Sequence, residues 1–255
     1  MKNSNISTAF TISALLMMSS AYAENKQSNL EQNGQWLAGA GVLGRTQAQI
    51  GVDSTTYLIP YIAYYGQSFF FEMNDFGYSM VDRQGYQLGL IGSLRFDGYD
   101  SGDSPALQGM RPRDHAIDGG VRIVLSGSLG EAEVKGITDL TNTHDGSEIS
   151  IAFSRPIIFH KTMIKPSLAV RWKSKKLMNY YYGVATDEVR SGRAAYNPDA
   201  SLSWVTELDV MHGLSKHLSV VVNLAYEQLG TEYTDSPIIE DDYVITMFGG
   251  LIYRF

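Results

Sequence analysis

The stretch that decides the fold is Tyr243-Val-Ile-Thr-Met-Phe-Gly-Gly-Leu-Ile-Tyr-Arg-Phe255. With a period of two, its large apolar residues share one face: Tyr243, Ile245, Met247, Leu251, Tyr253 and Phe255. The other face carries Val244, Thr246, Phe248, Ile252 and Arg254. A strand of this length can cross a bilayer at a tilt, and aromatic residues stand at both ends of its apolar face. The stretch therefore predicts a membrane-spanning strand that stops at an aromatic residue.

Similar alternation recurs upstream and predicts an all-β protein, a transmembrane antiparallel up-and-down β-barrel. The predicted strands span residues 36–45, 57–65, 69–73, 76–81, 86–97, 121–126, 131–140, 149–154, 164–173, 202–210, 218–227 and 243–255. The polar segments 98–118, 174–200 and 230–242 all follow odd-numbered strands, whereas short turns follow the even-numbered ones. Long outer loops and short inner turns are typical of outer-membrane barrels. We expect about 12 strands, with 10 as the alternative because the strand at 76–81 is short.

Three prolines fall within predicted strands, where each lacks the N–H group that a sheet needs. Pro156 and Pro166 flank one turn, and this position explains them. No feature of the sequence explains Pro60.

The first 23 residues predict a secretory signal peptide. Lys2 precedes an apolar run at 9–18, and Ala21-Tyr22-Ala23 provides a cleavage site after Ala23. We expect residues 1–23 to be removed and residues 24–255 to form one barrel domain in the bacterial cell outer membrane. Loss of Lys2 changes the formal net charge from -7 to -8, and an acidic chain without a basic patch argues against a nucleic-acid partner.

Charges of both signs lie opposite the apolar faces of the strands. A soluble sandwich would hide its apolar faces in a core, but aromatic residues at the ends of those faces favour a membrane barrel. The charges then face an interior, where they can pair and leave at most a narrow pore. The predicted lumen charges are Arg95, Asp97, Arg122, Glu133, Lys135, Arg171, Lys173, Glu207, Asp209, Glu227 and Arg254.

One loop carries a family resemblance. Asn179-Tyr180-Tyr181-Tyr182-Gly183-Val184, followed by Ser191-Gly192-Arg193 and Ala195-Tyr196-Asn197, resembles the signature loop of the MipA/OmpV family, the MltA-interacting outer-membrane proteins. The resemblance implies a barrel without catalytic activity, acting as a scaffold between a lytic transglycosylase and a murein synthase. The ending with Tyr253 and Phe255 resembles barrel closing strands, whose terminal aromatic residue is part of the insertion signal.

The alternative functions are a small-solute channel and a surface adhesin or antigen. The three tyrosines of the loop would form an adhesive or ligand-stacking surface, or would fold inward and plug the mouth. Oligomeric state is not predicted. The expected non-protein partners are outer-membrane lipid and lipopolysaccharide, with phosphates meeting Lys173, Lys175 and Lys176 at the rim.

No catalytic, cofactor-binding or metal-binding residues are predicted. The five histidines lie in outer segments and inner turns, without the spacing of an outer-membrane hydrolase. Asp97, Asp100 and Asp103 fall three apart, whereas calcium loops of the helix-loop-helix type place ligands two apart and close with a Glu. We therefore expect no cofactor.

Overall fold

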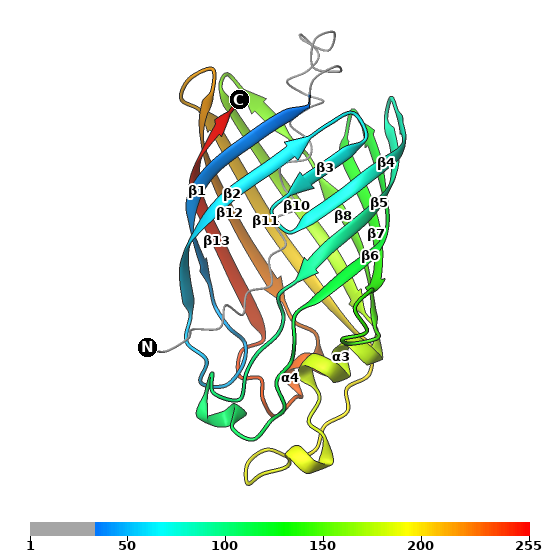
Figure 1. The fold of residues 1–255 in the computed structure, drawn as a ribbon, viewed down its shortest axis with the longest axis vertical. Coiled ribbons are helices and arrows are strands. Elements are labelled where there is room, and N and C mark those ends of the chain that lie inside the picture. The colour runs from blue at the N-terminus through cyan, green and yellow to red at the C-terminus, as the bar shows by residue number, and fades with distance from the viewer. Residues whose placement is uncertain (1–33) are drawn as a thin grey trace.

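The computed structural model describes residues 34–255, so the predicted signal peptide and the segment before Gly34 lie outside the described residues. The strands are β1 (Gln35–Arg45), β2 (Thr55–Tyr65), β3 (Phe69–Glu72), β4 (Asp75–Arg83), β5 (Tyr86–Arg95), β6 (Ala116–Gly127), β7 (Gly130–Asp139), β8 (Ser147–Ser154), β9 (Ile157–Phe159), β10 (Thr162–Lys173), β11 (Ser201–Gly213), β12 (Leu218–Gln228) and β13 (Tyr243–Arg254). Helical turns are η1 (Pro105–Leu107), α3 (Lys175–Tyr182), η2 (Thr186–Glu188) and α4 (Thr231–Thr234). The strands are tilted relative to the barrel axis and together form a barrel (Figure 1).

The barrel is closed and contains 12 strands around its circumference. β13 pairs with β1, and β10 pairs with β11, so antiparallel pairing runs all the way round. β8 and β9 both pair with β10 and form a single barrel strand, interrupted at Pro156. Proline has no N–H to donate, which accounts for the break. The prediction of about 12 strands is confirmed, and the short strand predicted at 76–81 exists as β4.

Side chains alternate between lipid and interior as the closing strand predicts. Met247 and Leu251 are about half exposed, whereas Val244, Phe248 and Ile252 are buried. Aromatic residues form a belt at each end of the outer surface. The inner belt includes Trp36, Tyr64, Phe69, Tyr253 and Phe255, and the outer belt includes Trp172, Trp204, Tyr226 and Tyr243.

The interior is not uniformly ionic. An apolar cluster of inward-facing side chains contains Leu43, Tyr61, Met163, Met211 and Phe248 from strands on one side of the barrel. Many of the buried charges, such as Asp118 and Glu148, lie toward the outer end, whereas Glu131 is buried near an inner turn. The predicted charged lumen is therefore only part of the interior, because an apolar cluster fills another part.

The loops are unequal at the two ends. The carboxyl terminus and the short turns lie at one end, and α3, α4 and the long loops lie at the other (Figure 1). This asymmetry identifies the first end as the periplasmic, inner end and the second as the outer end. None of the helices between residues 34 and 255 has the length and apolar character to cross a bilayer.

Candidate functional site

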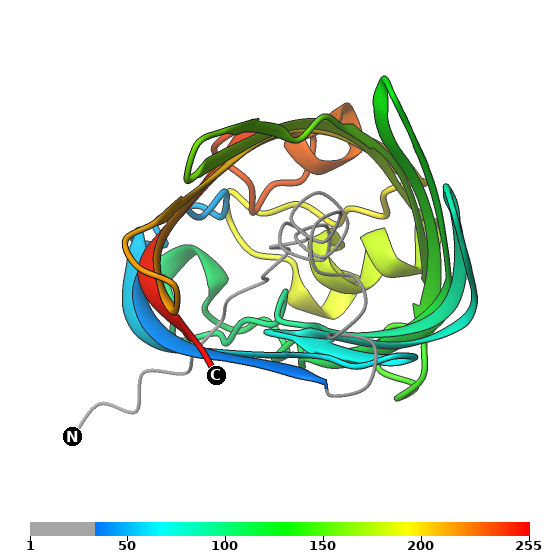
Figure 2. The same ribbon diagram turned by 90° about the horizontal axis from the view of Figure 1, so that it is seen from above.

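The outer loops fold together over the mouth of the barrel. Leu107, Met178, Tyr233 and Ile238, which belong to three different loops, are almost fully buried against one another. Ala48, from the link between β1 and β2, joins the same cluster. Seen along the barrel, the segment that contains α3 lies inside the ring of strands (Figure 2). We call this assembly of residues 46–54, 96–115, 174–200 and 229–242 the outer plug.

The family motif lies in the outer plug and is partly helical. Asn179, Tyr180, Tyr181 and Tyr182 end α3, and the Gly183 N–H donates to the Asn179 carbonyl. Val184 then bridges to Tyr196 by paired backbone hydrogen bonds. The tip of the loop contains Ser191 and Gly192, both exposed, and Gly192 has a φ of +83°.

The three tyrosines point into the plug. Tyr181 is 1% exposed, and its hydroxyl donates to the Asp114 carbonyl, while the Asp114 N–H donates to the Tyr180 hydroxyl. Tyr182 packs edge to face on Tyr233, with ring centroids 4.6 Å apart. Of the two roles considered for these rings, their positions match a plug rather than an exposed stacking surface.

Lys173 is not at the lipid surface. It is buried, and its ammonium lies 5.4 Å from the Tyr233 ring centroid and 6.0 Å from that of Tyr182. Burial raises the pKa of Tyr182 to about 12, although the Lys173 cation opposes this shift. The prediction that Lys173 meets lipid phosphates is wrong, because its strand register turns the side chain inward. Lys175 and Lys176 are exposed.

Glu188 joins two loops of the plug. Its buried carboxylate accepts hydrogen bonds from the Ala185 and Arg111 backbone N–H groups and from the Arg113 guanidinium, at 2.9–3.2 Å. Burial alone would raise the pKa of Glu188, but these donors lower it to about 2. The carboxylate is thus held ionised between segments that are far apart in the sequence.

Arg193, in the 174–200 loop, donates hydrogen bonds to the 96–115 loop. Its guanidinium donates to the carbonyls of Ala106, Gln108 and Glu188. Only 4% of the residue is exposed. The loops at 96–115 and 174–200 are consequently joined by charge-assisted hydrogen bonds in both directions.

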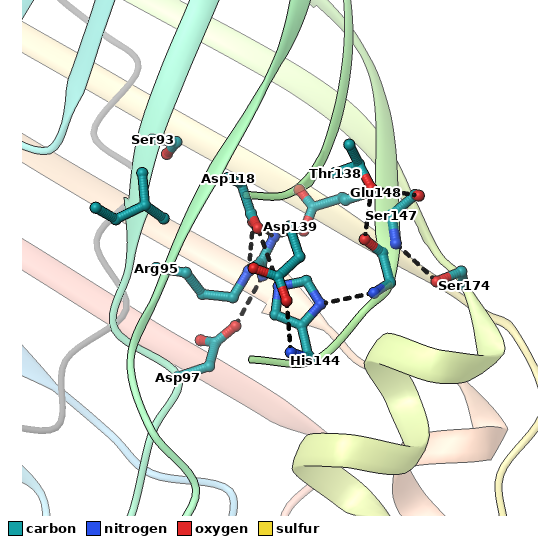
Figure 3. A network of polar contacts seen from close by, with 12 residues as sticks. Ser93, Arg95, Asp97, Asp118, Thr138, Asp139, His144, Ser147, Glu148 and Ser174 are labelled. Carbon is teal, nitrogen blue, oxygen red and sulfur yellow. Dashed lines mark hydrogen bonds and ion pairs between the residues drawn. The ribbon is translucent and has the colours of Figure 1, made fainter. Parts of the chain in front are cut away.

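On the barrel side of the plug, the guanidinium of one residue contacts three carboxylates (Figure 3). Arg95, at the end of β5, contacts Asp97 at 2.9 Å, Asp118 of β6 at 2.6 Å and Glu148 of β8 at 3.0 Å. Burial alone would raise the pKa of Asp97, but the Lys173 and Arg95 cations lower it below its usual value. The group connects three strands with the first residues of an outer loop.

His144 extends this group, and both of its ring nitrogens have hydrogen-bond partners within the protein. Ligand atoms of Asp118, Asp139 and His144 lie within 4.8 Å of one another. The Gly146 N–H donates to His144 Nδ1, so Nε2 carries the proton that is shared with Asp118 at 2.9 Å. Asp139 accepts from the backbone N–H groups of residues 141, 144 and 145. Both imidazole nitrogens of His144 thus take part in hydrogen bonds, and the three residues stabilise the turn between β7 and β8.

The other predicted lumen charges on the strands form four local groups. Arg171 pairs with Glu227 at 3.2 Å near the outer end, and Arg122 pairs with Glu133 at 2.7 Å. Lys135 lies 3.9 Å from Asp75. Glu207 and Asp209 are buried side by side, and the Asn223 amide donates to both.

Three predicted site residues lie at the inner end. Arg254 is partly exposed at the inner mouth. Tyr253 and Phe255 face outward at the inner belt, with ring centroids 5.1 Å apart. Their part in membrane insertion remains a prediction.

Some of the site's central residues were not predicted. Asp118 and Glu148 lie on the same inward faces as Arg122 and Ser150, so extending two predicted strands toward the outer end would have found them. Glu188 and His144 lie in loops, where no periodicity shows the direction of a side chain. Arg193 belongs to the quoted motif, but its contacts with the 96–115 loop could not be predicted for the same reason.

A polar cavity of about 70 Å³ remains between the plug and the network. Arg45, Arg95, Asp97, Lys173 and Glu227 contribute to its lining. The volume suffices for a few water molecules and is far below that of a small-molecule site.

Comparison with known proteins fits this geometry. The family model described as MltA-interacting protein MipA matches residues 38–255. The chain belongs to the MipA family. Among curated relatives, the putative outer membrane protein YiaT of Escherichia coli O157:H7 is 29% identical over 230 residues, or 85% of this chain and 89% of that protein.

Two further relatives extend the family picture. The MltA-interacting protein of Escherichia coli K12 is 26% identical over 226 residues, covering 87% of this chain and 91% of its own length. OmpV of Vibrio cholerae is 22% identical over 235 residues and is named as an outer membrane protein, with 91% of both chains covered. The MipA-family chain described here is an outer-membrane β-barrel, and none of these three relatives is named as an enzyme.

Proposed function

We propose that this MipA-family barrel is a non-catalytic tether that brings a lytic transglycosylase and a murein synthase together at the inner face of the outer membrane. The observation that carries the proposal is the closed outer mouth, whose buried charged side chains bind groups of neighbouring loops and strands. A barrel of this kind has little room for a solute pathway, so its contact surfaces lie at the ends. The name of the MltA-interacting relative supports a lytic transglycosylase as one of the two partners.

The inner end has chemistry suited to protein contact. Lys161 and Lys216 are exposed in neighbouring turns, and neither forms an ion pair within residues 34–255. Leu129 and Leu214 are 75% and 50% exposed in turns at the same end. Apolar side chains bordered by unpaired charges are common in transient interfaces.

Capture from purified components tests the proposal. The barrel in lipid nanodiscs should retain both a lytic transglycosylase and a murein synthase. The double variant Lys161→Glu/Lys216→Glu should lose at least about tenfold in affinity, which corresponds to about 1.4 kcal/mol. The matched control is Lys175→Glu/Lys176→Glu at the outer end, which should bind as the wild type does. If the wild-type barrel captures neither enzyme, the tether function is wrong for this protein.

A second candidate is a surface adhesin, favoured by the projecting tip of the 174–200 loop (Figure 1). Val189 is 47% exposed there, and the side chain of Asp187 is 68% exposed. Replacing Val189 and Arg190 with serine removes apolar and charged contacts at the tip without touching the buried tyrosines. Adhesion to host-cell surfaces that survives this change would count against the adhesin function at this tip.

A further inference from the structure

The barrel wall is incomplete beside β2. β3, between β2 and β4, has only four residues, and its hairpin with β4 reverses at Met73, which has a φ of +55° (Figure 1). β2 therefore pairs with β3 only at residues 63–65, and the Met73 N–H donates the next hydrogen bond to the Ile62 carbonyl. Within residues 34–255, the part of β2 at 55–61 has a strand partner on the β1 side alone.

The free edge of β2 presents backbone polar groups. These groups alternate in direction along a strand, and those of Ile62 face β3. The corresponding groups of Leu58 and Pro60 face the same side, where the described part of the chain offers them no hydrogen-bond partner. Pro60 brings no N–H to this edge, which explains why a proline is accommodated within β2. The Leu58 N–H and the carbonyls of both residues are left unpaired.

This edge lies at membrane depth. Tyr64 marks the inner aromatic belt on the same strand. At roughly 3.3 Å per residue and a tilt of about 40°, Leu58 lies about 15 Å outward from Tyr64, and Pro60 lies about 10 Å outward. Both fall within an apolar band that is ordinarily about 25 Å tall. Lipid tails cannot satisfy backbone polar groups, so the edge needs water or a polar occupant.

The lipid-facing apolar surface is also short on this side of the barrel. On β13 the surface runs from Tyr253 to Tyr243, which spans about 25 Å by the same geometry. On β2 it runs from Tyr64 to Leu58 and spans only about 15 Å, because the next outward residue is Thr56. The β2 side therefore matches a thinner bilayer than the β13 side does.

The aromatic belts show the same asymmetry. The outer belt residues Trp172, Trp204, Tyr226 and Tyr243 lie on β10 to β13. The last outward positions of β1 and β2 are Gly44 and Thr56, neither of which is aromatic. The open edge and the short apolar span thus lie on one face, which we call the β1–β2 face.

We propose that the barrel thins the outer membrane beside the β1–β2 face, so that polar headgroups of the outer leaflet and their water reach the edge at Leu58 and Pro60. A bilayer adapts to a short apolar span by thinning, and water then satisfies the N–H and carbonyl groups that lipid tails cannot. This membrane-thinning surface goes beyond the proposed tether function, which concerns the inner end of the barrel.

A second copy of the chain does not suit this edge. Two barrels with the same orientation in a membrane are related by an axis along the membrane normal. Antiparallel pairing of two β2 edges would instead require a two-fold axis perpendicular to the sheet, and one barrel would be inverted. Headgroups and water meet the edge without this conflict.

Fluorescence quenching by labelled lipids measures the thinning. The chain contains no cysteine, so Leu58→Cys and the control Leu224→Cys each provide one site for a fluorophore. Leu224 also faces outward, lies on a strand paired on both sides, and is as far from Leu218 at the inner end as Leu58 is from Tyr64. In dioleoyl phosphatidylcholine vesicles, the ratio of quenching by headgroup-labelled lipid to quenching by chain-labelled lipid should be at least about threefold higher at position 58.

Thinner vesicles separate local thinning from a simple difference in depth. In dilauroyl phosphatidylcholine the whole bilayer is thin, so the two quenching ratios should converge. Equal ratios in the dioleoyl vesicles overturn the proposal, and so does a difference that persists unchanged in the dilauroyl vesicles.

Amide exchange tests the edge itself without a substitution. In dioleoyl phosphatidylcholine nanodiscs, the Leu58 N–H should exchange at least about tenfold faster than that of Ile59, which faces β1. Equal protection of the two amides would mean that the edge is bonded rather than hydrated, and the proposal would then be wrong.

Discussion

The two ends of the barrel differ in how several of their charged side chains are placed. At the outer end, Arg95, Glu188 and Arg193 are buried and hold partners from different loops and strands. At the inner end, Lys161 and Lys216 are exposed, without ion-pair partners in the described part of the chain. Buried charges that lose a partner are costly, whereas exposed charges contribute little to stability. The outer end therefore depends on its charges to keep its shape, and the inner end has charges available for contact.

The largest expected loss of stability follows from replacing Arg95. Arg95→Met leaves three carboxylates without their guanidinium, and we expect a loss of about 3–5 kcal/mol in the free energy of unfolding. Urea titration in vesicles, followed by tryptophan fluorescence, measures it. The control Lys216→Met, at the inner end, should change the value by less than about 0.5 kcal/mol. Equal losses in the two variants would remove the distinction between the ends.

A smaller effect is expected at Glu188. Glu188→Gln keeps the shape but loses charge-assisted hydrogen bonds, at a cost of about 1.5–3 kcal/mol to the outer plug. Protease cleavage within residues 96–115 and 174–200 should accelerate, while the strands stay protected. Asp187→Asn, whose ion pair is exposed, is the control and should be cleaved at the wild-type rate. Unchanged cleavage of Glu188→Gln would show that this carboxylate does not hold the loops together.

Acid should gradually remove the stabilisation that the Glu188 carboxylate gives to the outer plug. The folded pKa of Glu188, about 2, lies below the ordinary value of 4.5, so its stabilisation is complete above pH 4.5 and is lost as the pH falls toward 2. The difference in cleavage rate between the wild type and Glu188→Gln should therefore shrink across this range. A difference that stays constant from pH 6 to pH 2 would contradict the assigned pKa.

The smallest expected effect is on stability at the inner end. Lys161→Ser with Lys216→Ser removes two solvated charges, and the free energy of unfolding should stay within about 0.5 kcal/mol of the wild type. The same urea titration checks it. A loss above about 1 kcal/mol would mean that these lysines support the barrel, and their availability for a partner would be in doubt.

The strands could be predicted from the sequence because lipid and interior impose a period of two on every strand. The lumen positions of Arg171 and Asp209 follow from that period alone. The outer plug could not be predicted in this way, since Tyr182 and Glu188 take their directions from contacts between distant loops. The place of Pro60 also depends on a neighbouring strand. β3 is too short to pair with this part of β2, so the missing N–H of Pro60 leaves no gap in the hydrogen bonding of the sheet.

Ion current through the reconstituted protein tests the closed outer mouth most directly. Wild-type protein in a planar bilayer should pass no steady current above that of the bare bilayer, and Glu188→Gln combined with Arg193→Ala should give intermittent openings. A steady, open conductance from the wild type would contradict a mouth sealed by its own loops.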